Sequence, residues 1–385
     1  MKKMTLLLFV LLAMNVNAAQ TDKFEVISDG DRGLALEWVD GGVGRNIAVD
    51  SIGSLYITTT QKPGNRLMSG YAFGENCCDA KYASYILKYS PNGGLEWVKE
   101  ICTKSAMDEF HEIAIDRNGI LLVNIEVSIM DSTINNSIYY DGNLISPDNR
   151  NHRKWGYQML LQINPETGNL LNSVWINEFV YPKIKLTDRN EIIWFGLIGD
   201  GKEPVWFKKF NGYSSDNLKT DLRSKGSADF YILCMDQDLQ KKWDFTLGGE
   251  GNEYDYGSLD YSINGDTLFV FTCFYSDSID IDPDPVSTYY IYGDKVFLNR
   301  DSMGAVLLAY DISGAQPELI NYRKLKYTEM IKYNSIYSHP KVGTYMSVEN
   351  KDWSMKNISD DNYLYASVDG DLNVVIDSTR PATRQ

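Results

Sequence analysis

A pair of sequence phrases recurs along most of the chain, and this internal repeat constrains the fold more than any other feature. The first phrase is an apolar run, a turn and a strand with an aromatic anchor, as in YILKYSPNGGLEWV. Successive anchors lie roughly 60 to 80 residues apart. The recognised anchors are Trp38, Trp97, Trp175, Trp243 and Tyr322.

The second phrase follows each anchor and predicts a β-hairpin. It reads IAVDSIGSLYIT from Ile47 and IAIDRNGILLVN from Ile113. A glycine stands where a tight hairpin turn needs a positive φ, and β-branched or aromatic residues flank the turn. In the copy that begins at Ile184, Glu191 stands in place of the glycine, so we expect that turn to differ.

Each repeat therefore predicts about four strands, because apolar runs alternate with turn signals and no repeat has a helical period. One such sheet cannot bury both faces, whereas blades packed around a ring bury one another. We expect an all-β fold, a β-propeller of four-stranded antiparallel blades. About five blades are favoured, with six or seven blades or an irregular ring as alternatives. The expected repeat units in a single domain of residues 19–385 are approximately 34–94, 95–170, 171–240, 241–316 and 317–385.

Residues 1–18 have the pattern of a secretory signal peptide. Lys2 and Lys3 precede an apolar run from Thr5 to Met14, and Ala18 supplies a small residue before the expected cleavage site. The run is too short for a membrane-spanning helix, which needs about 20 residues. We expect an exported protein in the periplasm, on the cell surface or in the medium, with no membrane insertion after signal removal.

The net charge restricts the classes of partner that the chain can bind, and the cysteine content restricts the disulfides that it can form. Lys and Arg number 37 against 52 Asp and Glu, a formal charge of −15 that argues against nucleic acids and anionic membranes as partners. The odd number of cysteines leaves at least one thiol outside a disulfide. One of the adjacent Cys77 and Cys78 is better placed to pair with Cys102 than with its neighbour, while Cys234 and Cys273 lie in apolar runs and are predicted to be buried.

The segment from Lys241 to Pro285 combines a Trp strand, glycines at Gly248, Gly249 and Gly251, a hairpin, and the sequence IDIDP from Ile279. This combination resembles the β-propeller repeat family of exported bacterial proteins (SBBP-type repeats), with the first and fifth units as degenerate copies. The resemblance implies a propeller and export, and it implies no single activity.

Catalytic patterns are weak, so no catalytic, cofactor-binding or metal-binding residue is predicted. His111, His152 and His339 lie in different repeats, and no serine or cysteine stands in a recognised nucleophile turn. The acids beside the anchors, Glu37, Glu96 and Asp244, recur with the repeat. Strand geometry therefore explains them better than glycosidase chemistry does.

Two further features leave alternatives open. Asp280, Asp282 and Asp284 have the spacing of the first ligands of an EF-hand, but Pro285 replaces the required glycine, so a solvated turn is favoured over a calcium site. Trp155 and Trp206 stand beside basic residues in long inserts, where local packing is favoured over stacking on a sugar or peptide.

These observations predict an exported, non-catalytic propeller that binds a protein or a glycan through loops on one face, with ligand-binding residues unidentified. The alternative is a carbohydrate-active, glycosidase-like enzyme with acidic residues in a central funnel. A purely structural envelope component is a third possibility.

Overall fold

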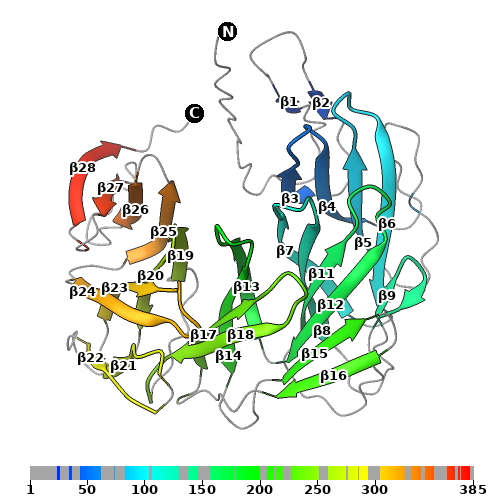
Figure 1. The fold of residues 1–385 in the computed structure, drawn as a ribbon. Helices are drawn as coiled ribbons and strands as arrows, with labels where there is room; N and C mark the ends of the chain where they lie inside the picture. Colours follow the sequence, from blue (N-terminus) through cyan, green and yellow to red (C-terminus); the bar gives the residue numbers. More distant parts are fainter. Residues whose placement is uncertain are drawn as a thin grey trace. The chain divides into compact units, whose positions relative to one another are not determined.

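The chain is built from β-strands (Figure 1). The computed structural model describes residues 24–26, 34–36, 44–61, 73, 83–103, 106–129, 138–145, 157–177, 179–199, 206–211, 214–219, 226, 228–250, 259–274, 276–284, 286–293, 304–325, 331–339, 343–350, 362–368, 372 and 374–381. Every helix or strand assigned in these ranges is a strand, which confirms the all-β prediction. The described residues include no helix able to cross a membrane. The expected signal peptide, residues 1–18, lies outside them.

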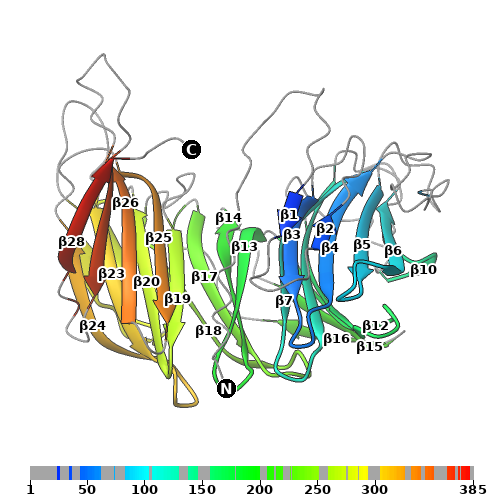
Figure 2. The same cartoon turned by 90° about the horizontal axis from the view of Figure 1, so that it is seen from above.

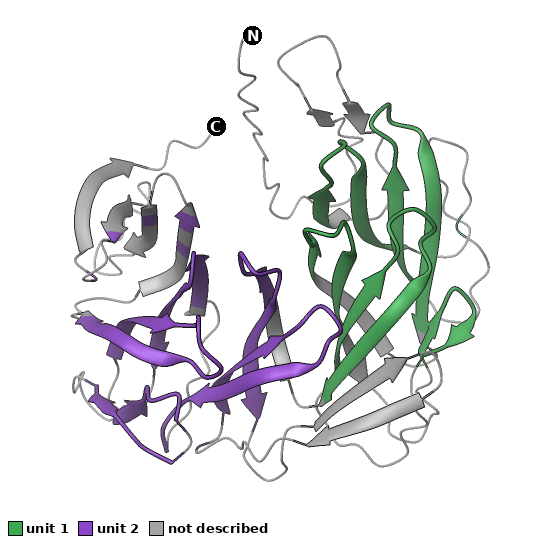
Figure 3. Cartoon of the chain, viewed as in Figure 1, with its two compact units in different colours: residues 1–177, 208–216 green, residues 178–207, 217–385 purple. Residues whose placement is uncertain are grey.

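The chain divides into two compact units (Figure 3). Unit 1 comprises Met1–Asn177 and Lys208–Asp216, and unit 2 comprises Glu178–Phe207 and Asn217–Gln385.

The first two sheets are antiparallel, and each contains a four-stranded meander with two additional strands at one edge. The first sheet contains β3 (Gly44–Val49), β4 (Leu55–Gln61), β5 (Ala83–Tyr89), β6 (Leu95–Thr103), β9 (Ile138–Tyr140) and β10 (Asn143–Leu144). The second contains β7 (Ala106–Ile115), β8 (Leu121–Ile129), β11 (Tyr157–Ile163), β12 (Leu170–Asn177), β15 (Trp206–Asn211) and β16 (Ser214–Lys219). The first strands of the two meanders, β3 and β7, lie beside each other (Figure 2). A separate short hairpin pairs β1 (Phe24–Val26) with β2 (Leu34–Leu36).

Unit 2 holds three four-stranded antiparallel meanders. The third sheet contains β13 (Phe179–Leu186), β14 (Ile192–Gly199), β17 (Ala228–Met235) and β18 (Lys241–Leu247). The fourth contains β19 (Leu259–Asn264), β20 (Thr267–Phe274), β23 (Gly304–Asp311) and β24 (Glu318–Leu325). The fifth contains β25 (Ile331–His339), β26 (Gly343–Asn350), β27 (Asn362–Val368) and β28 (Val374–Pro381). A small hairpin of β21 (Ser278–Asp280) and β22 (Tyr290–Tyr292) follows β20. Again the first strands are neighbours, because β19 contacts both β13 and β25.

The predicted four-stranded antiparallel units are thus present. Each meander starts on the hairpin phrase, and in the first four meanders the last strand is the one in which we expected an aromatic anchor. A meander and a sequence repeat are therefore out of phase: the fourth meander runs from Leu259 to Leu325, whereas the repeat unit predicted from the sequence spans residues 241–316.

The middle strands of the meanders are buried on both faces, which explains their continuous apolar runs. β14, β17, β20 and β23 each bury seven of eight residues. One apolar core lies between the third and fourth sheets, and another between the fourth and fifth. In unit 1 a core lies between the first two sheets. Because each buried large apolar side chain contributes about 1.5–3 kcal/mol, these cores dominate the stability of the units.

One turn design recurs at the first hairpin of the first three sheets. Each turn closes with two backbone hydrogen bonds, and its fourth residue has a positive φ. That residue is Gly53 at 92°, Gly119 at 82° and Asn190 at 62°. Our expectation for the third copy is wrong: Asn190, and not Glu191, takes the glycine position, and its hydrogen bonds match the other copies. Asparagine tolerates this left-handed conformation better than most residues do.

Asn190 gives a direct test of the turn. Both Asn190→Gly and Asn190→Ala remove the side-chain amide, but only alanine keeps a Cβ in the left-handed region. We expect the alanine variant to be about 1 kcal/mol less stable than the glycine variant in urea denaturation. An alanine variant as stable as the glycine variant would contradict the positive φ.

The last strand of each of the first four meanders contains a bulge, and the pairing beyond this bulge shows which residues hold equivalent positions. After the bulge, Trp97 pairs with Lys88 and Trp243 with Cys234, so these tryptophans are equivalent and pack on the cores. Asn172 and Asn321 hold the equivalent positions in the second and fourth sheets.

Trp175 and Tyr322, which we expected to be anchors, are displaced along their strands. Trp175 stands three residues beyond Asn172, and Tyr322 one residue beyond Asn321. An odd displacement turns a side chain to the opposite face of its sheet. Trp175 is still buried, but Tyr322 is 37% exposed, so the prediction of a core aromatic is wrong there.

Candidate functional site

Four tyrosines of the β21–β22 hairpin and of β24 are exposed. Tyr289, Tyr290 and Tyr292 come from the β21–β22 hairpin and Tyr322 from β24; together they are called the tyrosine surface. Their exposed fractions are 45%, 44%, 67% and 37%, respectively. Exposed aromatic rings are unusual enough to mark an interaction site when several occur together. The recurrence of tyrosine in TYYIY is visible in the sequence, but its exposure is not.

Alternation along β22 divides its side chains between core and solvent. Ile291 pairs with Ile279, and both are buried in the core of the third and fourth sheets. Tyr290 and Tyr292 lie on the opposite side of the strand, because side chains two positions apart share a side. The buried isoleucines therefore fix the orientation of the two tyrosines.

A hydroxyl contact joins the hairpin to β24. The hydroxyl groups of Tyr289 and Tyr322 are 2.9 Å apart, and their ring centroids are 5.4 Å apart with an interplanar angle of 58°. This hydrogen bond raises the pKa of Tyr289 above its ordinary value.

The acidic run before β22 builds a chain of local turns. Asp280 Oδ1 accepts the N–H of Asp282 at 3.2 Å, Asp282 Oδ1 that of Asp284 at 2.9 Å, and Asp284 Oδ1 that of Val286 at 2.9 Å. These bonds show that the run forms local turns; Asp284 is exposed, as expected for a solvated turn, but Asp280 is buried, so the prediction of a solvated turn is wrong there. Within the described ranges, no group of three or more His, Cys, Asp or Glu side chains is placed to hold a metal ion.

Two parts of the repeat motif, the glycine pair Gly248–Gly249 and the β21 segment, are in contact. The N–H of Asp280 donates to the carbonyl of Gly248 at 2.9 Å, and the two residues form an isolated bridge. A Cβ on Gly249 would overlap the backbone carbonyl oxygen of Ser278. The glycines are thus required for the close approach of the β21 backbone. Gly251 lies outside the described residues.

A buried carboxylate links the first strands of unit 2. Asp260 on β19 is 8% exposed; its Oδ1 lies 2.9 Å from Lys183 Nζ on β13, and its Oδ2 accepts the N–H of Ile336 on β25 at 2.9 Å. These contacts connect three sheets and assign Asp260 to positioning. The glycosidase hypothesis therefore gains no candidate acid from this residue.

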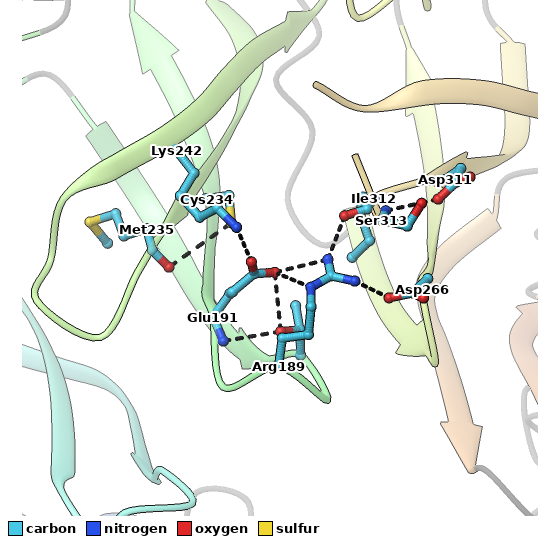
Figure 4. A network of polar contacts seen from close by, with 10 residues as sticks. Arg189, Glu191, Cys234, Met235, Lys242, Asp266, Asp311, Ile312 and Ser313 are labelled. Atoms are coloured by element: carbon cyan, nitrogen blue, oxygen red, sulfur yellow. Dashed lines mark hydrogen bonds and ion pairs between the residues drawn. The ribbon is translucent and has the colours of Figure 1, made fainter. Parts of the chain in front are cut away.

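Another polar network joins the third and fourth sheets (Figure 4). Glu191 accepts hydrogen bonds from Arg189 at 3.0 and 3.1 Å and is ion-paired with Lys242; Arg189 also contacts Asp266 and the carbonyl of Ile312. Burial alone would raise the pKa of Glu191, but the hydrogen bonds from Arg189 and Lys242 outweigh it and hold the pKa below its ordinary value. The network acts as a structural clamp that holds the third and fourth sheets together, and no pattern in the sequence predicts it.

Three of the cysteines lie within the described residues. Cys234 and Cys273 are buried thiols, which confirms their predicted burial. Burial raises the pKa of Cys234 to about 12, so its thiol is not a nucleophile at neutral pH. Cys102 is disulfide-bonded. Cys77 and Cys78 lie outside the described residues.

The remaining sequence candidates divide into two groups. Glu96 pairs with Lys88 at 2.7 Å and Asp244 with Lys241 at 3.0 Å, so both acids have local partners. Trp194, on β14, is fully buried. The other candidates are outside the described residues, as for Glu37, Trp38, His152 and Trp155, or have undescribed side chains, as for His111, Trp206 and His339.

Comparison with known protein families and with curated proteins gives no match to this chain. The resemblance to the propeller repeat family therefore rests on the residues themselves.

Proposed function

We propose that the chain is an exported, non-catalytic β-propeller of five blades that binds a macromolecular ligand, a protein or a glycan. Five four-stranded meanders support the propeller, as do the neighbouring first strands within each unit and the middle strands buried on both faces. Blades packed through both faces around their first strands have these properties.

The tyrosine surface is the observation that carries the binding function. Tyrosine is enriched in interfaces because it combines a large apolar ring with a polar hydroxyl at a small entropic cost. The described acids at the inner strands and turns support a structural role, so no catalytic step is assigned. Export is supported by the signal-like segment and by the disulfide at Cys102, since disulfides persist in oxidising compartments.

A thermal-shift screen of residues 19–385 against a panel of purified glycans and proteins from the cell envelope tests this function. A ligand at 100 times its dissociation constant should stabilise the fold by about 2.7 kcal/mol. We expect a shift with at least one ligand, and a bound glycan recovered at its original length. Shortening of the glycan would favour the enzyme alternative, and the absence of any shift would contradict the binding function.

A further inference from the structure

We propose that the tyrosine surface is a binding site for an uncharged glycan chain. This inference rests on the proposed binding function and names its site and ligand class. The surface belongs entirely to unit 2 and consists of side chains whose positions are described.

The rings suit a ligand with alternating apolar and hydroxylated faces. Tyr290 and Tyr292 project from one side of β22 about 7 Å apart, as their two-residue separation requires. The Tyr289–Tyr322 pair, joined through its hydroxyls, supplies two more exposed rings at the start of β22, on the side of Ile291. A sugar ring can stack its C–H face on such a ring while its hydroxyls bond to the phenol oxygen, because tyrosine has both an apolar body and a polar end.

The loop beside the rings presents mostly hydrogen-bonding groups, and Val286, which is 91% exposed, is its exposed apolar side chain. Ser287, Thr288 and Asp284 are exposed in the loop that precedes β22. The serine and threonine hydroxyls can donate to or accept from sugar hydroxyls, and the aspartate carboxylate can accept from them. A protein interface would instead favour a charge-depleted apolar centre, which this loop does not provide.

The negative charge of the chain favours an uncharged glycan over an anionic one. The chain carries a formal charge of −15, and Asp277 and Asp284 are exposed close in sequence to β21. A polyanionic chain such as alginate would be repelled by this field. An uncharged polysaccharide meets no such penalty, so the electrostatics favour it.

The surface is also held in place before binding. Asp280 Oδ1 accepts the N–H of Tyr289 at 2.8 Å, and Ser287 Oγ donates to Asp282 Oδ2 at 2.6 Å. These bonds fix both ends of the turn that leads into β22. A rigid site loses little conformational entropy when a ligand binds, so modest stacking contacts are sufficient for measurable affinity.

Affinity gel electrophoresis with hydroxyethylcellulose, dextran and galactomannan, and with alginate as the anionic comparison, tests the site. We expect residues 19–385 to be retarded by at least one uncharged polysaccharide and not by alginate. Tyr290→Ala and Tyr292→Ala should each weaken retardation about tenfold, while Tyr290→Phe, which keeps the ring, should stay within about threefold of the parent. Leu171→Ala, at a 41% exposed apolar position on β12, is the matched control and should bind normally.

The possible results distinguish a failure of the proposed site from a failure of the proposed binding function. Retardation that the tyrosine variants leave unchanged would overturn the site while the binding function stands. A chain that ignores every polysaccharide but binds an envelope protein would overturn the ligand class. Preferential retardation by alginate would overturn the requirement for an uncharged chain. The proposed function itself fails only if neither glycan nor protein binds.

Discussion

Gly249→Ala is expected to destabilise unit 2 by about 3 kcal/mol, the larger end of the usual cost of overpacking. The added Cβ would overlap the Ser278 carbonyl oxygen, which is backbone and cannot rotate away as a side chain can. Relief requires β21 to move from its contact with Gly248, which the Asp280 N–H···O bond of 2.9 Å maintains. Urea denaturation monitored by circular dichroism measures the loss.

Gly199→Ala is the matched control for this substitution. An added Cβ at Gly199 would have no neighbouring atom within 4 Å, so the same change of residue type should cost little there. Equal stability of the two variants would show that the Gly-Gly segment does not pack against β21 as described.

The second large effect is expected at Glu191. Glu191→Gln keeps the side-chain size but removes the charge that pairs with Arg189 and Lys242, while the Glu191 side chain is only 8% exposed. Breaking a fully buried ion pair costs about 3–5 kcal/mol. The side chains of Arg189 and Lys242 are each slightly more than a third exposed to solvent, which screens the ion pairs. We therefore expect a smaller loss of about 2 kcal/mol at pH 7.

The pH dependence of this loss has a defined sign. The folded-state pKa of Glu191 is lowered, so the unfolded chain binds its proton more readily. The stabilisation is therefore fully present above the unfolded pKa, about 4.3, and is lost as the pH falls through the lower folded pKa. The stability difference between the parent and Glu191→Gln should shrink below about pH 4. Glu318→Gln, at an exposed position on β24, is the control for the change of residue type.

Local features of the fold were predictable from the sequence because they depend on residues close along the chain. The hairpin phrases have positive-φ residues such as Gly53 and Gly119, and the Asp50 carboxylate accepts the N–H of Ser54 at 2.8 Å within the same turn. Residue type and spacing determine such turns directly. Anchor equivalence was harder to predict, because it depends on strand register: Asn321 pairs with Ala309 at the equivalent position, and Tyr322, one residue further along, lies on the other face.

The candidate site and the structural clamps were less predictable, because they unite residues that are distant in sequence. Tyr289 contacts Tyr322 across 33 positions, and Lys183 contacts Asp260 across 77. No periodicity or motif encodes those pairings; the packing of complete sheets produces them. The tyrosine content was conspicuous from composition alone, yet only the burial of Ile291 reveals which side of β22 faces solvent.

A crystal structure of residues 19–385 is the most direct test of the central claim that the five meanders are blades of one propeller with a binding surface on the fourth. We expect five four-stranded blades around a common axis, with β3, β7, β13, β19 and β25 innermost and the tyrosine surface exposed. Sheets that fail to share an axis, or tyrosines covered by other parts of the chain, would contradict it.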